Sequence, residues 1–304
     1  MYRWEAFKKI PKFVLIGMFI SSAAAIAEEN IDPKNMPIAD VHMHVYERKH
    51  SPDDQLIRMK ENNVRWGGAV GDLQPLFIKE LKNRYIAAYG QKGWTSEFRS
   101  GGNGALTQMS NFDRFFSEAD ELFKKGVIKG FGEIHTNSLG RNRRTVDFDG
   151  PVVQAMYKMA EKYGGFVNVH HSASRAPIKT VIQMAKKYPG ATFIFSHCAF
   201  DKFAKEMVSL FSKTVNTFCE ISSLGIIHET RIAYSESGLT QAYKELILRF
   251  PDRVMLGTDG CCHAASRYGE MIKEMRDHVL PHLPPDVRKK LAYENAVRVF
   301  KLDP

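Results

Sequence analysis

The 304-residue chain has little cysteine, no block of like charge, and no long apolar run after its first segment. Four cysteines are too few for the dense disulfide framework of a small secreted scaffold. The lack of like-charge blocks argues against a nucleic-acid-binding arm. No stretch beyond residue 27 is long and apolar enough to cross a bilayer. With 44% hydrophobic and 25% charged residues, the composition excludes a disordered or fibrous protein and indicates a globular one.

The first segment has the features of a targeting signal. Residues 1–12 are basic, residues 13–25 are mostly apolar, and Ala25-Ile26-Ala27 precedes Glu28. A positive start, a short apolar core and a small-x-small end are typical of a secretory signal peptide. A membrane anchor is the alternative, and the short run disfavours it. We therefore expect residues 1–27 to be removed and the mature protein, residues 28–304, to be periplasmic or secreted.

That segment also carries part of the positive charge. The chain has 43 Lys and Arg against 34 Asp and Glu, a net charge of +9. Four basic residues and one acidic residue lie in residues 1–27, so cleavage leaves +6. This value is mild for the size of the chain, so the sequence predicts no nucleic-acid partner and, after cleavage, no membrane association. A homo-oligomer stays open.

After residue 28, short apolar runs alternate with amphipathic helical patterns. The predicted strands are Ile38–His44, Val64–Val70, Arg84–Gly90, Val127–Glu133, Phe166–His170, Thr192–His197, Val215–Ile221 and Arg253–Thr258. The predicted helices are Gln55–Asn62, Asp113–Lys125, Val152–Tyr163, Ile178–Lys187, Lys202–Ser212, Gln241–Arg249 and Gly269–His278, with a last one from Pro285 to near Phe300. Such alternation predicts a parallel sheet, because each crossover between parallel strands needs a helix.

Eight strand–helix units in about 250 residues match the arithmetic of a (β/α)8 barrel. The rival is an open doubly wound sheet, which would place a glycine-rich phosphate turn after the first strand. The first strand instead runs into Val41-His42-Met43-His44. No linker or second compositional region interrupts the chain. The sequence therefore predicts an α/β fold, a single-domain (β/α)8 TIM barrel.

Histidines and carboxylates gather where the predicted strands end. These residues are His42 and His44, Glu133 and His135, His170 and His171, His197, and Asp259. In TIM barrels the active site lies at the carboxyl ends of the strands. Residues two apart on a strand share a face, so His42 and His44 should both point into the barrel mouth. Of the adjacent pair, His170 is the expected inward residue because it follows Val-Asn-Val directly.

Burying this many imidazoles and carboxylates around one cavity is costly unless a cation offsets them. Imidazole and carboxylate ligands suit zinc, iron or manganese. The pattern therefore predicts a divalent-metal site, with zinc preferred and manganese and iron as alternatives.

The order His-x-His, Glu, His, His, Asp over successive strands resembles the amidohydrolase superfamily of metal-dependent barrels. The last stretch, Leu283–Leu302, with its Asn-Ala and Phe-x-Leu, resembles the closing helix of the amidohydrolase-related branch, which includes lactonases and decarboxylases. The resemblance covers essentially the whole mature chain. It implies a first metal held by His42, His44 and Asp259, a shared ligand Glu133, and a second metal completed by His170 and His197. In mononuclear relatives His197 instead acts on substrate or orients water, so one metal or two stays open.

This chemistry predicts an exported metal-dependent hydrolase that acts on a small molecule. A divalent metal lowers the pKa of bound water from about 15.7 towards 7. Asp259 is the expected proton carrier, with His197 as the next candidate. The bond cleaved stays open among amide, lactone, ester and phosphoester. A metal-dependent decarboxylase of the same fold and a non-catalytic exported metal-binding protein are the alternatives.

Weaker signals point to substrate contacts and to cysteine pairing. The expected substrate-contacting residues are Arg141, Arg144, His228 and His263, all placed in loops after predicted strands. The alternative for the two arginines is a solvated loop. The cysteines are Cys198, Cys219, Cys261 and Cys262, which allow three full pairings, and the sequence does not choose among them.

Overall fold

The computed structural model describes residues 31–45, 51–71, 73–90, 109–136, 146–171, 177–199 and 204–304. Residues Ile31–Pro304 belong to one folded unit. The expected signal peptide and the two arginines Arg141 and Arg144 lie outside the described residues. The same holds for the side chains of residues 262 and 263.

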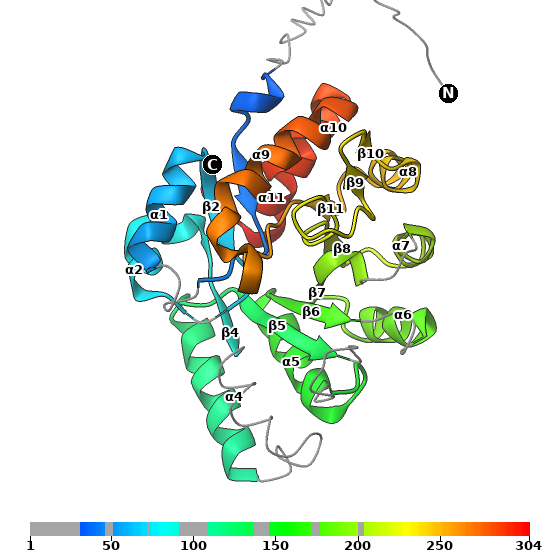
Figure 1. The fold of residues 1–304 in the computed structure, drawn as a ribbon. Coiled ribbons are helices and arrows are strands. Elements are labelled where there is room, and N and C mark those ends of the chain that lie inside the picture. The colour runs from blue at the N-terminus through cyan, green and yellow to red at the C-terminus, as the bar shows by residue number, and fades with distance from the viewer. Residues whose placement is uncertain are drawn as a thin grey trace, which may run out of the picture. The chain divides into compact units, whose positions relative to one another are not determined.

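Parallel strands form the centre of this unit (Figure 1). They are β1 (Ile38–Asp40), β2 (Val64–Gly68), β3 (Tyr85–Ile86), β4 (Ala88–Gly90), β5 (Gly130–Thr136), β6 (Phe166–His171), β7 (Thr192–Phe195), β8 (Thr217–Glu220) and β11 (Val254–Met255). Hydrogen bonds order them as β1-β2-β3 and as β4-β5-β6-β7-β8-β11. Because only Ala87 separates β3 from β4, the two behave as one barrel strand that joins the two sheets.

The last strand, β11, meets the first, β1, through hydrogen bonds beyond the regular ladders. The regular ladder does not continue from β11 to β1, but the Val41 amide donates to the Leu256 carbonyl at 3.1 Å. The Asp259 amide donates to the His42 carbonyl at 2.9 Å. These bonds place β1 and β11 side by side, so the fold follows the eight-stranded parallel barrel that the sequence predicts.

Helices lie outside the strands (Figure 1). They are α1 (Pro52–Glu61), α2 (Pro75–Leu81), α4 (Met109–Lys124), α5 (Pro151–Tyr163), α6 (Ile178–Lys187), α7 (Ala204–Phe211), α8 (Gln241–Arg249), α9 (Tyr268–His278), α10 (Pro285–Lys289) and α11 (Asn295–Phe300). Their buried faces are mostly apolar, as Val153 and Met156 of α5 and Val181 of α6 illustrate. Periodicity predicts α6 and α8 to the residue, because both have a clear apolar stripe.

Several boundaries differ from the predictions. Strand β5 covers Gly130–Thr136 rather than Val127–Glu133, because the chain uses residues 126–129 to leave α4. The turn is visible as a bond from the Val127 amide to the Leu122 carbonyl. The short helix α2 and the antiparallel hairpin of β9 (Tyr234–Ser235) and β10 (Gly238–Leu239) were not predicted. The last predicted helix is α10 and α11 joined by a π-helical turn, Lys290–Glu294.

Five strands also end earlier than predicted, and three of them lead into the predicted ligands. β1 stops at Asp40, β7 at Phe195 and β11 at Met255. His42, His44, His197 and Asp259 therefore lie in the first residues after the strands. Their position outside the strands matters, because a loop backbone can direct each side chain individually. In a strand, successive side chains must point to opposite faces of the sheet.

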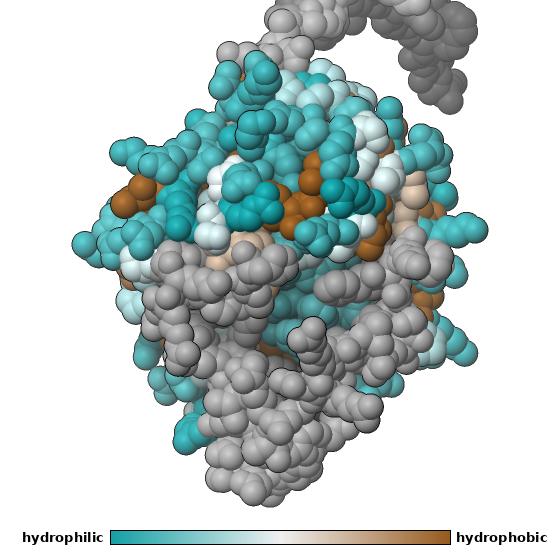
Figure 2. Space-filling view, in the orientation of Figure 1, coloured by the Kyte–Doolittle hydropathy of each residue, from teal (hydrophilic) through white to brown (hydrophobic). Residues whose placement is uncertain are grey.

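Alternate strand residues belong to two separate apolar clusters. Phe193 and Phe195 of β7 pack in the layer shared with the helices, whereas Ile194 belongs to a second cluster with Phe166, Phe218 and Met255. This is the period-two pattern of a sheet buried on both faces. The face drawn in Figure 2 is largely hydrophilic where residues are described. Within the described ranges, no helix combines the length and apolar character that crossing a bilayer requires.

Candidate metal centre

Three of the predicted ligands meet where β1 and β11 end. His42 Nε2 lies 3.2 Å from His44 Nε2. Asp259 Oδ1 lies 3.4 Å from the first of these nitrogens and 3.3 Å from the second. The two histidines therefore face one point, as predicted, although both lie after the end of β1 rather than on the strand. Two imidazole nitrogens and a carboxylate oxygen at these separations match the ligand types of zinc and related divalent ions.

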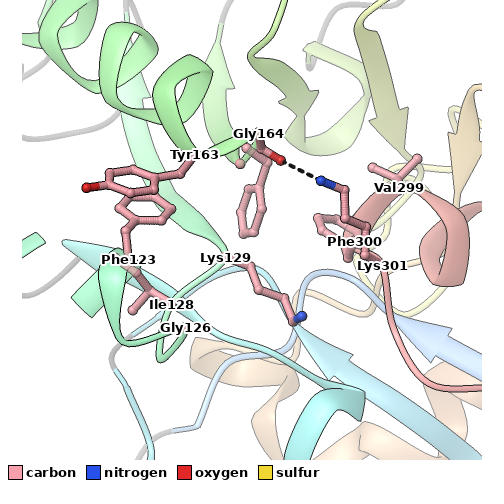
Figure 3. Close-up of a pocket in the computed structure, with 11 residues that line it drawn as sticks. Phe123, Gly126, Ile128, Lys129, Tyr163, Gly164, Val299, Phe300 and Lys301 are labelled. Atoms are coloured by element: carbon pink, nitrogen blue, oxygen red, sulfur yellow. Dashed lines mark hydrogen bonds between the residues drawn. The ribbon is translucent and has the colours of Figure 1, made fainter. Parts of the chain in front are cut away.

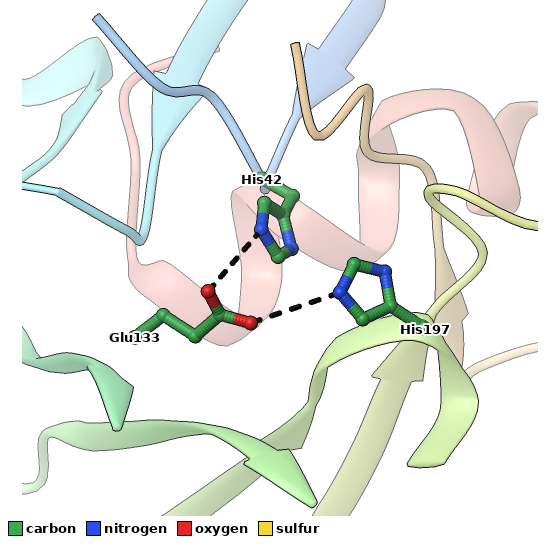
Figure 4. Close-up of side chains that lie close together, drawn as sticks. All are labelled: His42, Glu133 and His197. Atoms are coloured by element: carbon green, nitrogen blue, oxygen red, sulfur yellow. Dashed lines mark ion pairs between the residues drawn. The ribbon is translucent and has the colours of Figure 1, made fainter. Parts of the chain in front are cut away.

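Glu133 connects this group to His197 (Figure 4). Its Oε2 lies 3.7 Å from His42 Nε2, and its Oε1 lies 3.7 Å from His197 Nε2. His197 Nε2 is also 3.8 Å from Asp259 Oδ2. The carboxylate of Glu133 therefore lies between two sets of nitrogen donors, which is the place a shared ligand occupies.

On the other side of Glu133 stand His170 and a histidine that the ligand prediction omitted. His170 Nδ1 lies 2.8 Å from Glu133 Oε1, and His135 Nε2 lies 3.7 Å from Glu133 Oε2. The His170 ring meets the His197 ring edge-on, at 75°, but stacks on the His135 ring at 12° with centroids 4.4 Å apart. The available signal for His135 was its two-residue spacing from Glu133, the same spacing that links His42 and His44.

The choice of His170 over His171 agrees with the structure. His171 Nδ1 lies 3.1 Å from Thr136 Oγ1, and its ring packs against Phe148 and Phe195 in the layer between strands and helices. Adjacent strand residues point to opposite faces, so only one member of the pair reaches the centre.

The tautomers of two histidines follow from their partners. His42 Nδ1 lies 2.8 Å from a carboxylate oxygen of Glu220, which only accepts, so Nδ1 carries a proton. His197 Nδ1 lies 3.1 Å from the Ser222 carbonyl, which likewise only accepts. In both rings Nε2 is consequently the nitrogen that faces the centre and is placed to act as a ligand.

The electrostatics of the site call for a cation. Burial lowers the pKa of His42, but the negative charges of Glu133, Glu220 and Asp259 outweigh burial and raise it to about 10. Burial raises the pKa of Asp259, while charged His42 and a hydrogen bond from His44 bring it below its ordinary value. The pKa of Glu133 is likewise lowered, against burial, by His170 and His42. Excess negative charge beside converging nitrogens fits a divalent metal, so the residues present suit the ion that the pattern predicts.

The backbone at the site adopts an uncommon conformation. His197, Ser223 and Asp259 have φ of 55°, 54° and 48°, in the left-handed region that non-glycine residues seldom enter. Each such residue costs on the order of 1–3 kcal/mol and persists where the surrounding structure over-determines it. Gly132, before Glu133, serves a related purpose, since a Cβ there would lie 2.6 Å from the Ala69 carbonyl oxygen. Strained backbone conformations thus help to direct the side chains of His197 and Asp259 at the candidate metal centre.

Polar residues around the ligands were missed by sequence reasoning. Asp40 accepts hydrogen bonds from the amides of His42 and Thr258, at 3.1 and 2.9 Å, and so ties the end of β1 to the segment after β11. Ser223 Oγ donates to Asp259 Oδ2. Glu220 contacts both His42 and His197. None belongs to a recognisable motif, so no local signal identifies them.

Of the two histidines expected to contact substrate, the structure describes the side chain of His228 only. His228 lies near the site: its Nδ1 is 3.4 Å from Ser223 Oγ and its Nε2 is 3.1 Å from the Thr258 carbonyl oxygen. It therefore neighbours Asp259 through Ser223. His263 lies in a 3-10 helix, Cys262–Arg267, and its side chain is outside the described part.

The cysteine pairing is settled for two residues. Cys198 and Cys219 form a disulfide with a Cα–Cα distance of 4.8 Å. Cys198 directly follows His197 and Cys219 directly precedes Glu220, so the bond joins β7 to β8 immediately beside the site.

A separate cavity of about 210 Å³ lies at the opposite, amino ends of β5 and β6 (Figure 3). Phe123, Tyr163 and Phe300 give it apolar walls. Its two lysines are engaged: Lys129 Nζ donates to Asn83 Oδ1 at 2.6 Å, and Lys301 Nζ donates to the Gly164 carbonyl. None of the candidate ligands lines this cavity.

The comparisons with known proteins agree with this geometry. The amidohydrolase family model matches residues 39–302, so the chain belongs to the amidohydrolase family. Its members are metal-dependent enzymes, which confirms the prediction of a hydrolase-type enzyme at the level of the family. No curated protein matches the chain.

Solved structures share the barrel at low sequence identity. A Pseudomonas putida protein assigned as a 2-pyrone-4,6-dicarboxylic acid hydrolase is 13% identical, with a TM-score of 0.55 over 88% of this chain and 99% of that one. A protein of Acinetobacter baumannii with the same assignment is 11% identical, with a TM-score of 0.51 over 88% and 100%. The 5-carboxyvanillate decarboxylase of Novosphingobium aromaticivorans, solved with manganese, is 11% identical, with a TM-score of 0.50 over 82% and 80%. These likenesses confirm the TIM-barrel fold.

Proposed function

We propose that this protein is a metal-dependent hydrolase that uses an activated water on a small-molecule amide, lactone, ester or phosphoester. The observation that carries the proposal is Asp259, a partly buried carboxylate 3.3–3.4 Å from two imidazole nitrogens at a strand-end site. A bound divalent ion would lower the pKa of a coordinated water towards neutrality and polarise the attacked oxygen. Membership of the amidohydrolase family supports this reading.

Each residue has a proposed task. His42, His44 and Asp259 hold a first ion; Glu133, His170 and His197 hold a second ion if two are bound. Asp259 takes a proton from the attacking water at its carboxylate and passes it to the leaving group. Ser223, which donates to Asp259 Oδ2, keeps that carboxylate oriented.

His197, with Nε2 3.8 Å from the same oxygen, is the second candidate for proton transfer. His228, which lies beside Ser223, is proposed to contact substrate.

Zinc is the proposed metal, with manganese and iron as alternatives. Four of the six proposed donors are imidazoles, and each of them faces Glu133 or Asp259 through a nitrogen at 2.8–3.7 Å. Mixed nitrogen and oxygen donors of this kind suit zinc best among common ions, although the harder manganese also accepts carboxylate-rich sites. Elemental analysis of the purified protein distinguishes them.

Decarboxylation is the second candidate reaction. The same set of donors would hold a carboxylic acid substrate, and a manganese-containing decarboxylase shares the fold. The two reactions differ in their products: hydrolysis consumes water and releases no CO2, whereas decarboxylation releases one CO2 per turnover. A product assay separates them without knowledge of the exact substrate.

The experiment begins with the metal content of the purified protein. Metal-stripped protein is reloaded with zinc, manganese or iron and assayed against lactones, amides, phosphoesters and aromatic carboxylic acids, with both acid and CO2 release recorded. We expect metal-dependent release of acid without CO2. Turnover that survives complete chelation, or a chain that binds none of the three metals, would overturn the proposal.

Export is proposed separately. The disulfide between Cys198 and Cys219 supports it, because disulfides persist mainly in oxidising compartments. We expect the exported protein to begin at Glu28, after Ala25-Ile26-Ala27. Mass spectrometry of the exported protein checks this, and an intact Met1 would contradict cleavage.

A further inference from the structure

Glu220, the last residue of β8, is a fully buried carboxylate outside the proposed ligand set. Its oxygens accept four hydrogen bonds. Oε1 accepts from His42 Nδ1 at 2.8 Å, from the His197 amide at 2.9 Å and from Ser222 Oγ at 3.0 Å, while Oε2 accepts from the Ser222 amide at 2.6 Å. A buried charge is stable only when it is paired and hydrogen-bonded in this way.

Two of these bonds reach proposed ligands from different strands. The bond to His42 Nδ1 fixes the tautomer and the rotation of the ring, so that Nε2 faces His44 and Asp259. The bond to the His197 amide stabilises the backbone of His197, whose φ is 55°. A non-glycine residue keeps this conformation only where contacts with the rest of the structure hold it. One carboxylate thus constrains both histidines that flank Glu133.

The surrounding chain is shaped for this contact. A Cβ at Gly257 would lie 2.7 Å from both Glu220 Oε2 and His42 Cβ, so only glycine lets β8 and the end of β1 approach this closely. The disulfide between Cys198 and Cys219 joins the residues next to His197 and Glu220. Covalent and polar links therefore hold the same two strand ends.

We propose that Glu220 is a positioning residue that orients His42 through Nδ1 and His197 through its amide, so that both Nε2 atoms face the metal centre before an ion binds. The inference rests on the proposed metal-dependent function and assigns a residue outside the ligands. Carboxylates behind ligating histidines orient the ring and raise its basicity, and their loss typically weakens metal affinity about 10–100-fold.

The test compares Glu220→Gln with the matched control Glu274→Gln. Glu274 is also a buried glutamate, whose oxygens accept from the Ile227 amide and from Tyr234 OH, and it contacts none of the proposed ligands in the described residues. Zinc affinity of each metal-free protein is measured by chelator competition, together with its melting temperature and the absorption spectrum of its cobalt form. We expect about 10–100-fold weaker zinc binding and an altered cobalt spectrum for Glu220→Gln alone.

Each outcome decides the inference. Equal zinc affinity and an unchanged cobalt spectrum in folded Glu220→Gln would overturn the positioning role while leaving the proposed function intact. Absence of zinc binding by the wild-type protein would instead overturn the proposed function. If Glu220→Gln does not fold, nitrogen NMR of the zinc-loaded wild type decides: we expect His42 protonated at Nδ1 and coordinated through Nε2, and coordination through Nδ1 would refute the inference.

Discussion

His42 and His135 stand on opposite flanks of the same centre, and the structure holds them very differently. His42 is fully buried, and Glu220 fixes its far nitrogen at 2.8 Å. His135 is 37% exposed, and it stacks on His170 with Glu133 3.7 Å away. The β1–β11 flank, formed by His42, His44 and Asp259, is thus braced, in the sense that Glu220 holds His42 from behind. The β5–β6 flank, formed by His135 and His170, is open towards solvent. A braced flank suits retention of an ion, and an open one suits the entry of substrate and water.

The largest expected effect on metal binding comes from replacing His42 and His44, the two histidines of the braced flank. His42→Ala together with His44→Ala should abolish metal binding and activity while the barrel stays folded, because the packed strand layers lie below the strand ends. Elemental analysis and circular dichroism on one preparation check this. Full metal content in the double variant would show that the β1–β11 flank is not the metal site.

Asp259→Asn tests the same flank more gently. The amide keeps the size and one acceptor oxygen but loses the charge and the basicity of the carboxylate. General acid–base catalysis contributes about 10²–10⁴-fold, so kcat should fall by that order and far more than metal content does. Both quantities are measured on the same protein. A fully metallated variant with near wild-type turnover would transfer the proton-carrying role to His197, whose Nε2 lies 3.8 Å from Asp259 Oδ2.

The disulfide adds a third element to the braced side. Its two cysteines are 21 residues apart in sequence, and closing a loop of that length stabilises a protein by about 3 kcal/mol in the chain-entropy model. Replacing both Cys198 and Cys219 by serine should lower the free energy of unfolding by that amount. Urea denaturation measures it, and Cys261→Ser serves as the control because it leaves the bond between Cys198 and Cys219 in place. Equal losses of unfolding free energy in the double variant and in the control would contradict a stabilising role of the disulfide.

Proton release should accompany metal binding at the braced flank. The pKa of His42 is raised to about 10 in the metal-free protein, so its imidazole is protonated at neutral pH. A metal must displace that proton from Nε2, and affinity therefore rises with pH until the pKa is passed. The expected slope is about tenfold in affinity per pH unit between pH 6.5 and 8, corresponding to one proton. Calorimetry in buffers of different ionisation enthalpy counts the proton; a count of zero would contradict the raised pKa.

The smallest effect is expected on the open flank. His135→Ala removes a partly exposed ring that stacks on His170 and lies 3.7 Å from Glu133, and we expect zinc affinity to change by about twofold or less. The same chelator competition used for the other variants measures it. A loss comparable to that of His42→Ala would erase the distinction between the flanks and make His135 a ligand.

Much of the barrel and most of the candidate centre could be predicted from the sequence, because both rest on local patterns. Apolar periodicity gives α6 and α8 to the residue, since 3.6-residue spacing is a property of each segment alone. The spacing of His42 and His44 likewise predicts a shared face. Strand ends were less predictable, as at β7, where the chain turns at Ser196: the Ser196 hydroxyl donates to Asn168 of β6, and the next amide donates to Glu220 of β8.

What tertiary structure alone decided is which groups support the ligands. Nothing in Cys219-Glu220-Ile221 distinguishes Glu220 from any buried strand carboxylate, and its partner His42 is 178 residues away. The pairing of Cys198 with Cys219 likewise depends on β7 lying beside β8. The sequence by itself determined residue chemistry and local periodicity, which any segment carries with it. The packing of the first strand beside the last ones determined which carboxylate reaches which ring.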